Sequence, residues 1–126
     1  MSQIINTTSA PAPIGPYSQA VIANGFLFLS GQVAINPESG EVIQSSIPEE
    51  THQVMRNIKA VLLEAGYEFK DVVKTTIFLS DMDLFAEVNT VYGSYFETNF
   101  PARETVAVKG LPKGVNVEIS MTAYKG

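Results

Sequence analysis

The chain of 126 residues contains no cysteine and no tryptophan, and it has a single histidine. Without cysteine it can form no disulfide, thiolate nucleophile or cysteine-bound metal site, and this absence fits a reducing, cytoplasmic location. The one histidine, His52, lies on a predicted helix with no second ligand at a useful spacing, so we expect a solvated side chain and no metal site. It also lacks a nucleophile-like context, which argues against a Ser-His-Asp triad.

Basic residues are scarce as well. Lys and Arg number 8 against 13 Asp and Glu, which gives a formal net charge of −5. Because no basic cluster occurs, we expect no nucleic-acid partner. No apolar run approaches the ~18 residues of a membrane span, and residues 1–13 lack the basic region and apolar core of a secretory signal, so no membrane partner is expected. No glycine-rich phosphate loop is present, and we expect no cofactor.

What the chain does contain is typical of one globular domain that spans residues 1–126. Hydrophobic residues make up 45% of the sequence and charged residues 17%, which is enough apolar content for a core. The apolar periodicities, the Asn24-Gly25 hairpin signal and Gly66 as a helix stop predict the elements. Strands are expected at 17–23, 26–33, 72–79, 105–108 and 115–123, and helices at 48–65 and after Asp81 or Asp83.

This β-β-α-β-α-β-β order predicts an α+β fold, in which one mixed sheet carries two helices on one face. The first hairpin and the 72–79 strand are apolar on both sides, with Phe26 and Phe28 opposite Leu27 and Leu29. Two helices can cover only one face of such a sheet. The second apolar face therefore predicts that subunits associate through the sheet.

Arg103 is the residue whose position is hardest to explain by folding alone. Only two arginines occur; Arg56 lies in an ordinary amphipathic helix, whereas Arg103 opens the apolar run 105–108. A guanidinium at the mouth of a buried strand is costly unless an anion meets it, and its fork of donors fits a carboxylate or a phosphate. We therefore predict that Arg103 anchors a small anionic ligand. Glu104 need not neutralise it, because neighbours on a strand point to opposite faces.

Other positions carry weaker signals, which folding alone could also explain. Ser30 and Gly31 end a strand, either as a simple glycine bend or as a hydroxyl and backbone N–H groups that face a ligand. Tyr17 follows a Gly-Pro turn and is either a half-buried aromatic or a site residue. Glu118 is an ordinary surface charge if its face is open, but a carboxylate with a raised or tuned pKa if a partner subunit covers it. Asn89 reads as a surface amide on the second helix.

Six segments of the chain occur in a recognisable order. They are IGPYSQA at 14–20, SGQ at 30–32, VKTT at 73–76, FAEVN at 85–89, FPAR at 100–103 and VEI at 117–119. Together they resemble the signature of the Rid (YjgF/YER057c/UK114) family, and most closely its RidA-type branch of 2-iminobutanoate/2-iminopropanoate deaminases. The resemblance runs from about residue 4 to residue 123, and the GPYSQA and PAR segments are specific as a pair.

The resemblance implies a chorismate-mutase-like α+β subunit and a homotrimer, in which the sheets line an inner barrel and the three sites lie between subunits. It implies small 2-imino and 2-keto acids as partners, and no metal or cofactor. By this resemblance Arg103 binds the substrate carboxylate, Glu118 handles the hydrolytic water, and Tyr17 and Ser30 assist. The further substrate-binding residues are Gly31, Asn89 and Thr105.

The activity that the resemblance implies is hydrolysis of 2-iminopropanoate and 2-iminobutanoate to 2-keto acids and ammonia. Two other functions stay open. A non-catalytic sensor of 2-keto acids would need Arg103 but not Glu118. An RNA-cleaving translation inhibitor, a role also associated with this family, is disfavoured by the acidic charge. Glu104 departs from related sequences, which often have a small residue there, and it could alter the polarity of the pocket.

Overall fold

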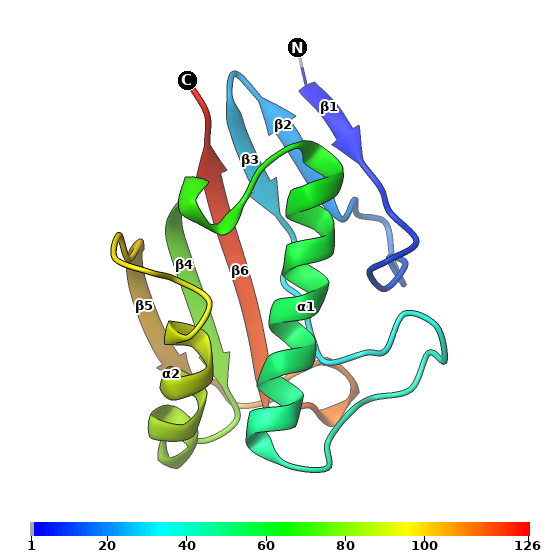
Figure 1. Cartoon of the computed structure of the whole chain (residues 1–126). Helices are drawn as coiled ribbons and strands as arrows, with labels where there is room; N and C mark the ends of the chain where they lie inside the picture. Colours follow the sequence, from blue (N-terminus) through cyan, green and yellow to red (C-terminus); the bar gives the residue numbers. More distant parts are fainter. Residues whose placement is uncertain (1) are drawn as a thin grey trace.

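The computed structural model describes residues 2–126, which form one six-stranded sheet with two α-helices (Figure 1). The strands follow the order β1-β2-β3-β6-β4-β5 across the sheet. Neighbours are antiparallel except β4 and β5, which run parallel. The strands are β1 (Ser2–Ile5), β2 (Ala20–Ala23), β3 (Phe26–Leu29), β4 (Val72–Leu79), β5 (Ala102–Ala107) and β6 (Val117–Tyr124); the helices are α1 (Ile47–Ala65) and α2 (Phe85–Gly93), with short 3₁₀ helices at Phe69–Asp71, Met82–Leu84 and Pro112–Gly114.

Both α-helices pack on the same face of the sheet, as Figure 1 shows. The hydrophobic core lies between these two layers, because alternate residues of the strands and the apolar stripe of α1 point into it. This confirms the predicted α+β class, with a mixed sheet and two helices on one face. Fully buried core residues include Leu27, Met55, Ile58, Leu62, Ile77, Leu79, Val117 and Ile119.

Local signals in the sequence set the bounds of α1 and of the first hairpin. Ser46 caps α1, where its side chain accepts a backbone hydrogen bond, and Pro48 occupies the first turn. Gly66 ends the helix with a left-handed φ of 83°, which glycine adopts without a Cβ clash. Between β2 and β3, Asn24 and Gly25 have φ values of 54° and 85°, as a tight hairpin turn requires.

The N-terminal strands depart from the prediction in three ways. β1 is absent from the predicted order; it pairs with β2 at the edge of the sheet, and its sequence shows no clear alternation. β2 begins at Ala20 rather than residue 17, because Tyr17 closes a tight turn in which its N–H lies 2.8 Å from the carbonyl of Gly15. β3 ends at Leu29 rather than residue 33; beyond it Gly31 passes close to Glu118, and Gln32 makes an isolated bridge to Ile119 of β6.

β5 is an edge strand and not the buried strand that its apolar run predicts. The last strand, β6, lies between β3 and β4, which leaves β5 paired with β4 alone. Most side chains of β5 are exposed, and Arg103 is half-buried. The desolvation of its guanidinium within one chain is therefore smaller than the sequence suggests. β5 starts three residues earlier than predicted and β6 two residues later.

The region around α2 confirms one of the two predicted capping residues and corrects the prediction for His52. Asp81 is the capping residue, since its side chain accepts a backbone hydrogen bond at the 3₁₀ helix that leads into α2. The helix ends at Gly93, so Tyr95 follows it in a turn. His52 of α1 is not solvated: it is half-buried, and its Nδ1 lies 2.8 Å from the Tyr95 hydroxyl.

The face of the sheet opposite the helices is open and apolar in the described chain. Residues from four strands expose large apolar side chains there, and Phe28 is 49% exposed. Subunit association through this face stays a prediction. The exposed apolar residues on these strands are Phe26, Phe28, Val73, Val106 and Tyr124.

Glu50 is a buried carboxylate that ties the start of β6 to α1, a role that the sequence did not reveal. It accepts hydrogen bonds from the N–H groups of Asn116 at 2.7 Å and Val117 at 3.0 Å, and from the Asn116 side chain at 3.0 Å. Glu50→Ala leaves these donors without an acceptor, at ~1–3 kcal/mol each. We expect it to lower the free energy of unfolding in urea by at least ~3 kcal/mol. The exposed neighbour provides the control: Glu49→Ala should cost less than ~1 kcal/mol, and equal losses would contradict this role.

Candidate functional site

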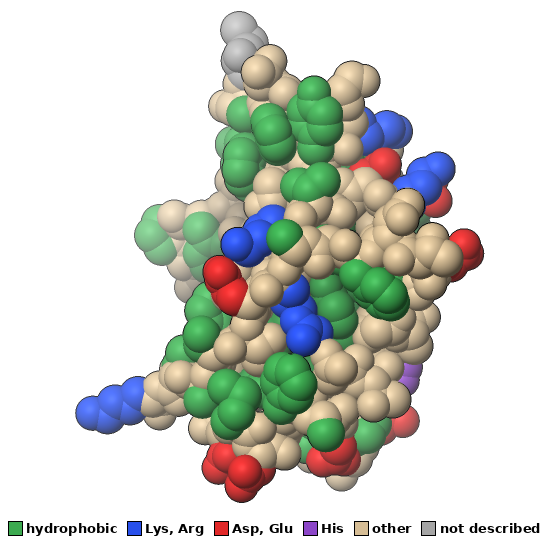
Figure 2. Space-filling view, turned by 90° about the vertical axis from the view of Figure 1, so that its left-hand side faces the viewer, with side chains coloured by type: hydrophobic (Ala, Val, Ile, Leu, Met, Phe, Trp, Pro, Cys, Tyr) green, Lys and Arg blue, Asp and Glu red, His purple; other side chains and the backbone are tan. Residues whose placement is uncertain are grey.

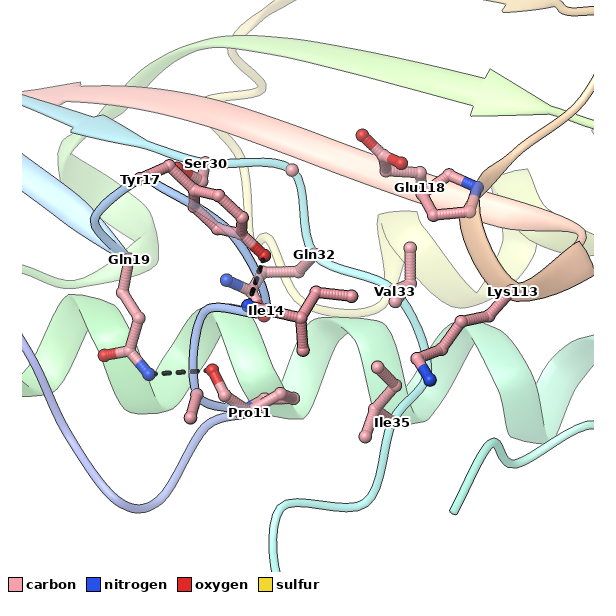
Figure 3. A pocket seen from close by; sticks show the side chains of 13 residues that line it. Pro11, Ile14, Tyr17, Gln19, Ser30, Gln32, Val33, Ile35, Lys113 and Glu118 are labelled. Carbon is pink, nitrogen blue, oxygen red and sulfur yellow. Dashed lines mark hydrogen bonds between the residues drawn. The ribbon is translucent and has the colours of Figure 1, made fainter. Parts of the chain in front are cut away.

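A cavity of about 330 Å³ lies between the N-terminal loop, the chain that follows β3, and β6 (Figure 3). Four of the predicted site residues line it: Tyr17, Ser30, Gly31 and Glu118. A small concave space with an apolar wall and a few polar groups is typical of a site for a small organic molecule. The remaining lining residues are Pro11, Ala12, Ile14, Gln19, Gln32, Val33, Ile35, Pro112 and Lys113.

Glu118 is the acidic group of this cavity. It lies on β6 between the buried residues Val117 and Ile119, so its side chain points to the face of the sheet opposite the helices. Partial burial raises the pKa of its carboxyl above the ordinary value, and no charge or hydrogen bond in the described chain offsets that effect. A carboxylate with a raised pKa is suited to take a proton from water and to return it.

Gly31 lets the backbone pass close to the Glu118 side chain. A Cβ at this position would collide with the carboxylate, so a larger residue here would displace one or the other. The N–H groups of Ser30 and Gln32, on either side, donate to backbone carbonyls at 2.9 and 2.8 Å. The Gly31 N–H has no acceptor within residues 2–126, and it is therefore available to a ligand beside Glu118.

The two hydroxyl groups of the cavity are held differently. Ser30 Oγ donates to the carbonyl of Ser18 at 2.6 Å, so its proton is engaged and its oxygen can accept from a ligand. The Tyr17 ring extends from the N-terminal loop toward the cavity (Figure 3), and its hydroxyl accepts a long bond of 3.4 Å from the Ile14 N–H. The Tyr17 hydroxyl therefore keeps its own proton to donate.

Two of the wall residues that sequence reasoning did not name stand out by their structure, Gln19 and Lys113. The buried Gln19 side chain accepts from the Thr7 N–H at 2.7 Å and donates to the Pro11 carbonyl at 2.9 Å, which fixes the N-terminal loop against the sheet (Figure 3). A polar residue directly before the apolar strand Ala20–Ala23 is the signal that could have found it. Lys113 lines the wall with a left-handed φ of 57°, and no pattern in the sequence points to it.

Arg103, Asn89 and Thr105 form a second group at the β5 edge. Arg103 Nη1 donates to Asn89 Oδ1 at 2.6 Å, so Asn89, which is exposed on the helix surface as expected, also holds the Arg103 guanidinium. As strand alternation predicts, the Glu104 side chain points to the face of the sheet opposite Arg103. Its carboxylate lies 3.4 Å from Lys74 Nζ. The Thr105 hydroxyl oxygen is buried and has no hydrogen-bond partner in the described chain.

The two groups lie on opposite faces of the sheet. Thr75 of β4 is paired both with Arg103 and with Met121 of β6, and Thr75 and Met121 are buried beneath the helices. Glu118 is paired with Phe78, which lies three residues beyond Thr75 and points to the other face. A single chain therefore does not bring Arg103 and Glu118 together. The sequence could not predict this separation of Arg103 from Glu118, because the separation depends on the order of the strands in the sheet.

The side chains of the two groups define what chemistry they can perform. One group supplies a carboxylate, two hydroxyls and a backbone N–H, and the other supplies a guanidinium, a carboxamide and an unpaired hydroxyl. This set suits proton transfer to or from water beside a small organic anion. Among residues 2–126, no three His, Cys, Asp or Glu side chains gather as metal ligands would.

In the described chain, none of the helices has the length and apolar character needed to cross a membrane.

Nearly the whole chain is similar to known proteins in sequence and in fold. A family model described as endoribonuclease L-PSP matches residues 7–125. A RutC family protein of Pyrococcus horikoshii is 50% identical over 125 residues, which cover 99% of each chain. The human 2-iminobutanoate/2-iminopropanoate deaminase is 43% identical over 124 residues, which cover 98% of this chain and 90% of the human one. A Rid-family crystal structure from Yersinia pestis, of a protein of unknown function, has a TM-score of 0.96 at 47% identity and covers 99% of this chain and 100% of its own.

Proposed function

Because the chain belongs to the endoribonuclease L-PSP family, which includes the Rid proteins, we propose that it hydrolyses 2-imino acids to 2-keto acids and ammonia. Its substrates would be 2-iminopropanoate and 2-iminobutanoate. The human relative named for this activity supports the proposal. The observation that carries it is Arg103, held by a single hydrogen bond beside the unpaired Thr105 hydroxyl.

Arg103 would bind the carboxylate of the substrate. A guanidinium has five N–H donors, and within residues 2–126 only one hydrogen bond, to Asn89, engages them. A free pair of donors can hold a carboxylate through two parallel hydrogen bonds, which fixes its orientation as well as its position. The Thr105 hydroxyl would give one more bond, and binding would then satisfy a buried polar group that is costly to leave unpaired.

Glu118 would handle the water. The carbon of a protonated imine is already electrophilic, so the carboxylate takes a proton from water while the water oxygen bonds to that carbon. The resulting tetrahedral adduct carries a hydroxyl and an amine. Glu118 gives its proton to the nitrogen, the C–N bond breaks, and the hydroxyl proton leaves with the products, which are a 2-keto acid and ammonium. Tyr17, Ser30 and the Gly31 N–H would hydrogen-bond the imine or the water.

The proposal includes a homotrimer whose sites lie between subunits. Since the Arg103 group and the Glu118 group lie on opposite faces of one sheet, a working site needs Arg103 of one subunit beside Glu118 of a neighbour. The open apolar face supplies a surface for that association, because burying exposed rings such as Phe28 and Tyr124 against a partner is favourable.

The activity is tested by following 2-keto acid release from freshly generated 2-iminopropanoate. The imine also reacts with water unaided, so the rate without protein is the baseline. We expect a rate that rises in proportion to the protein concentration. A rate that stays at the baseline for several imino acids would remove the proposed activity.

Mixing two inactive variants tests the shared site. In trimers assembled from equal amounts of Arg103→Ala and Glu118→Gln chains, some interfaces combine an intact Arg103 with an intact Glu118. With random assembly, about a quarter of the sites are intact, so about a quarter of the wild-type activity should return. Each variant taken through the same unfolding and reassembly alone is the control. No recovery, with mixed trimers shown by mass spectrometry, would place the site within one chain.

Two other functions have separate tests. The family model is described as an endoribonuclease, but a net charge of −5 and the absence of a basic cluster in the sequence argue against an RNA-binding surface; strong, salt-sensitive RNA binding would favour this alternative. A sensor of 2-keto acids would bind pyruvate through Arg103 without turning over an imine. Pyruvate binding that is strong in a protein with no imine turnover would favour that role.

A further inference from the structure

Two aromatic rings of α2 face the guanidinium of Arg103. Its Cζ atom lies 5.5 Å from the centre of the Phe85 ring and 5.2 Å from the centre of the Tyr92 ring, and both distances are within the ~6 Å range of cation–π attraction. Figure 2, which looks onto the side of the molecule that carries β5 and α2, shows basic side chains set among hydrophobic ones. The guanidinium is thus held against an aromatic surface.

The same helix supplies all three contacts. Phe85, Asn89 and Tyr92 are spaced i, i+4 and i+7, so they lie along one face of α2. Asn89 stands between the two aromatic positions and accepts the hydrogen bond from Arg103 Nη1 at 2.6 Å. The guanidinium therefore lies alongside two turns of helix, and the bond to Asn89 is the one hydrogen bond that it makes within residues 2–126.

Tyr92 is itself anchored to the sheet. It is 3% exposed, and its hydroxyl donates to Thr75 Oγ1 at 3.0 Å. Thr75 is fully buried and is the partner of Arg103 in the register of β4 with β5. The ring that faces the guanidinium is therefore fixed to the strand pair that carries Arg103, so helix and sheet hold the arginine together.

An arginine on an exposed edge strand would otherwise sample many rotamers, and a ligand would have to select one of them at a cost in affinity. From these contacts we propose that Phe85 and Tyr92 are positioning residues, which hold the Arg103 guanidinium so that its free donors face a substrate carboxylate. The inference rests on the proposed function, because it takes Arg103 as the carboxylate anchor. Under this proposal, α2 contributes to substrate affinity because it holds Arg103 in place.

Phe85→Leu is the sharpest test, because Phe85 is already 38% exposed and its replacement leaves the core intact. We expect the dissociation constant for pyruvate, measured by calorimetry, to rise about three- to tenfold, as the loss of one cation–π contact implies. KM for 2-iminopropanoate should rise by a similar factor while kcat changes less than about twofold, since the carboxylate is bound alike in ground state and transition state. Phe85→Tyr keeps a ring and should restore wild-type affinity.

Two further variants complete the design. Tyr92→Phe keeps the ring but loses the bond to Thr75, so it should raise the dissociation constant by less than Phe85→Leu does. Phe69→Leu is the matched control, because the Phe69 ring packs instead against the rings of Tyr95 and Phe96, each 5.5 Å away. Pyruvate affinity should not change in this control.

The outcomes separate the two proposals. If Arg103→Ala abolishes pyruvate binding while Phe85→Leu leaves it unchanged, the positioning role is wrong and the proposed function stands. If pyruvate binding survives Arg103→Ala, both are overturned. If Phe69→Leu weakens binding as much as Phe85→Leu does, the effect is general packing and the positioning role is again wrong.

Discussion

Arg103→Ala should lower kcat/KM for 2-iminopropanoate by about 10²- to 10³-fold, which corresponds to ~3–4 kcal/mol of lost transition-state stabilisation. The loss is large because the substrate keeps its charge and would enter a partly dry cleft without a cation to meet it. No neighbouring cation can take over, since Lys74 is paired with Glu104 on the opposite face of the sheet. The unpaired Thr105 hydroxyl could supply only a neutral hydrogen bond.

Two other variants show whether charge or geometry is lost. Arg103→Lys keeps the positive charge but not the planar fork, so it should fall between the wild type and the alanine variant. Arg56→Ala removes the only other arginine, which lies on α1 and bonds Gln53; its kcat/KM should stay within about twofold of the wild type. Activity of Arg103→Ala within a few-fold of the wild type would show that the carboxylate is bound elsewhere.

The parts of the fold that depend on neighbouring residues could be predicted from the sequence. The Asn24-Gly25 turn, the end of α1 at Gly66 and the strand Val72–Leu79 all follow from short-range backbone preferences and apolar periodicity. The strand order could not be predicted in this way. β6 is last in the chain but lies between β3 and β4, and this long-range pairing alone makes β5 an edge strand.

The candidate site could also be predicted only where the type of a residue and its neighbours along the chain were sufficient. Residue type and position singled out Arg103, a charge that opens an apolar run, whereas Glu118 stayed open between a surface charge and a site carboxylate until the family resemblance gave it a role. The sequence could not predict contacts between residues that lie far apart along the chain, such as the hydrogen bond from Arg103 to Asn89 and those that the buried Glu50 carboxylate accepts. A surface amide and a helix-start glutamate look ordinary in sequence. Their roles depend on tertiary contacts, because the start of β5 lies beside Asn89 and the start of β6 lies beside Glu50.

Glu118→Gln should lower kcat for 2-iminopropanoate by about 10²- to 10⁴-fold, the usual contribution of a general acid–base group. Glutamine has the same shape but cannot accept a proton from water, so the pocket is preserved while the chemistry is lost. Pyruvate binding should stay within about threefold of the wild type, because Arg103 and not Glu118 holds the carboxylate. A normal kcat in this variant would show that another group activates the water.

The pH dependence of kcat/KM is a second test of the role of Glu118. Burial raises the pKa of the Glu118 carboxyl, so the carboxylate form needed for catalysis is lost at a higher pH than for an ordinary glutamate. We expect kcat/KM of the wild type to fall on acidification with an apparent pKa above the ordinary carboxyl range of about 4.3. The residual activity of Glu118→Gln should lack this acid limb, whereas Glu104→Gln, which changes an exposed carboxylate on β5, should keep it.

Stability should move in the opposite sense from activity. A raised pKa in the folded chain means that folding favours the protonated carboxyl, so the ionised form opposes folding. This penalty is absent below the ordinary pKa of the carboxyl, grows as the pH rises toward the raised pKa of Glu118, and is complete above it. Glu118→Gln removes the penalty, so the variant should gain stability relative to the wild type as the pH rises through that window. Urea denaturation at several pH values would measure the gain, and a constant difference between the two proteins would show that the pKa of Glu118 is not raised.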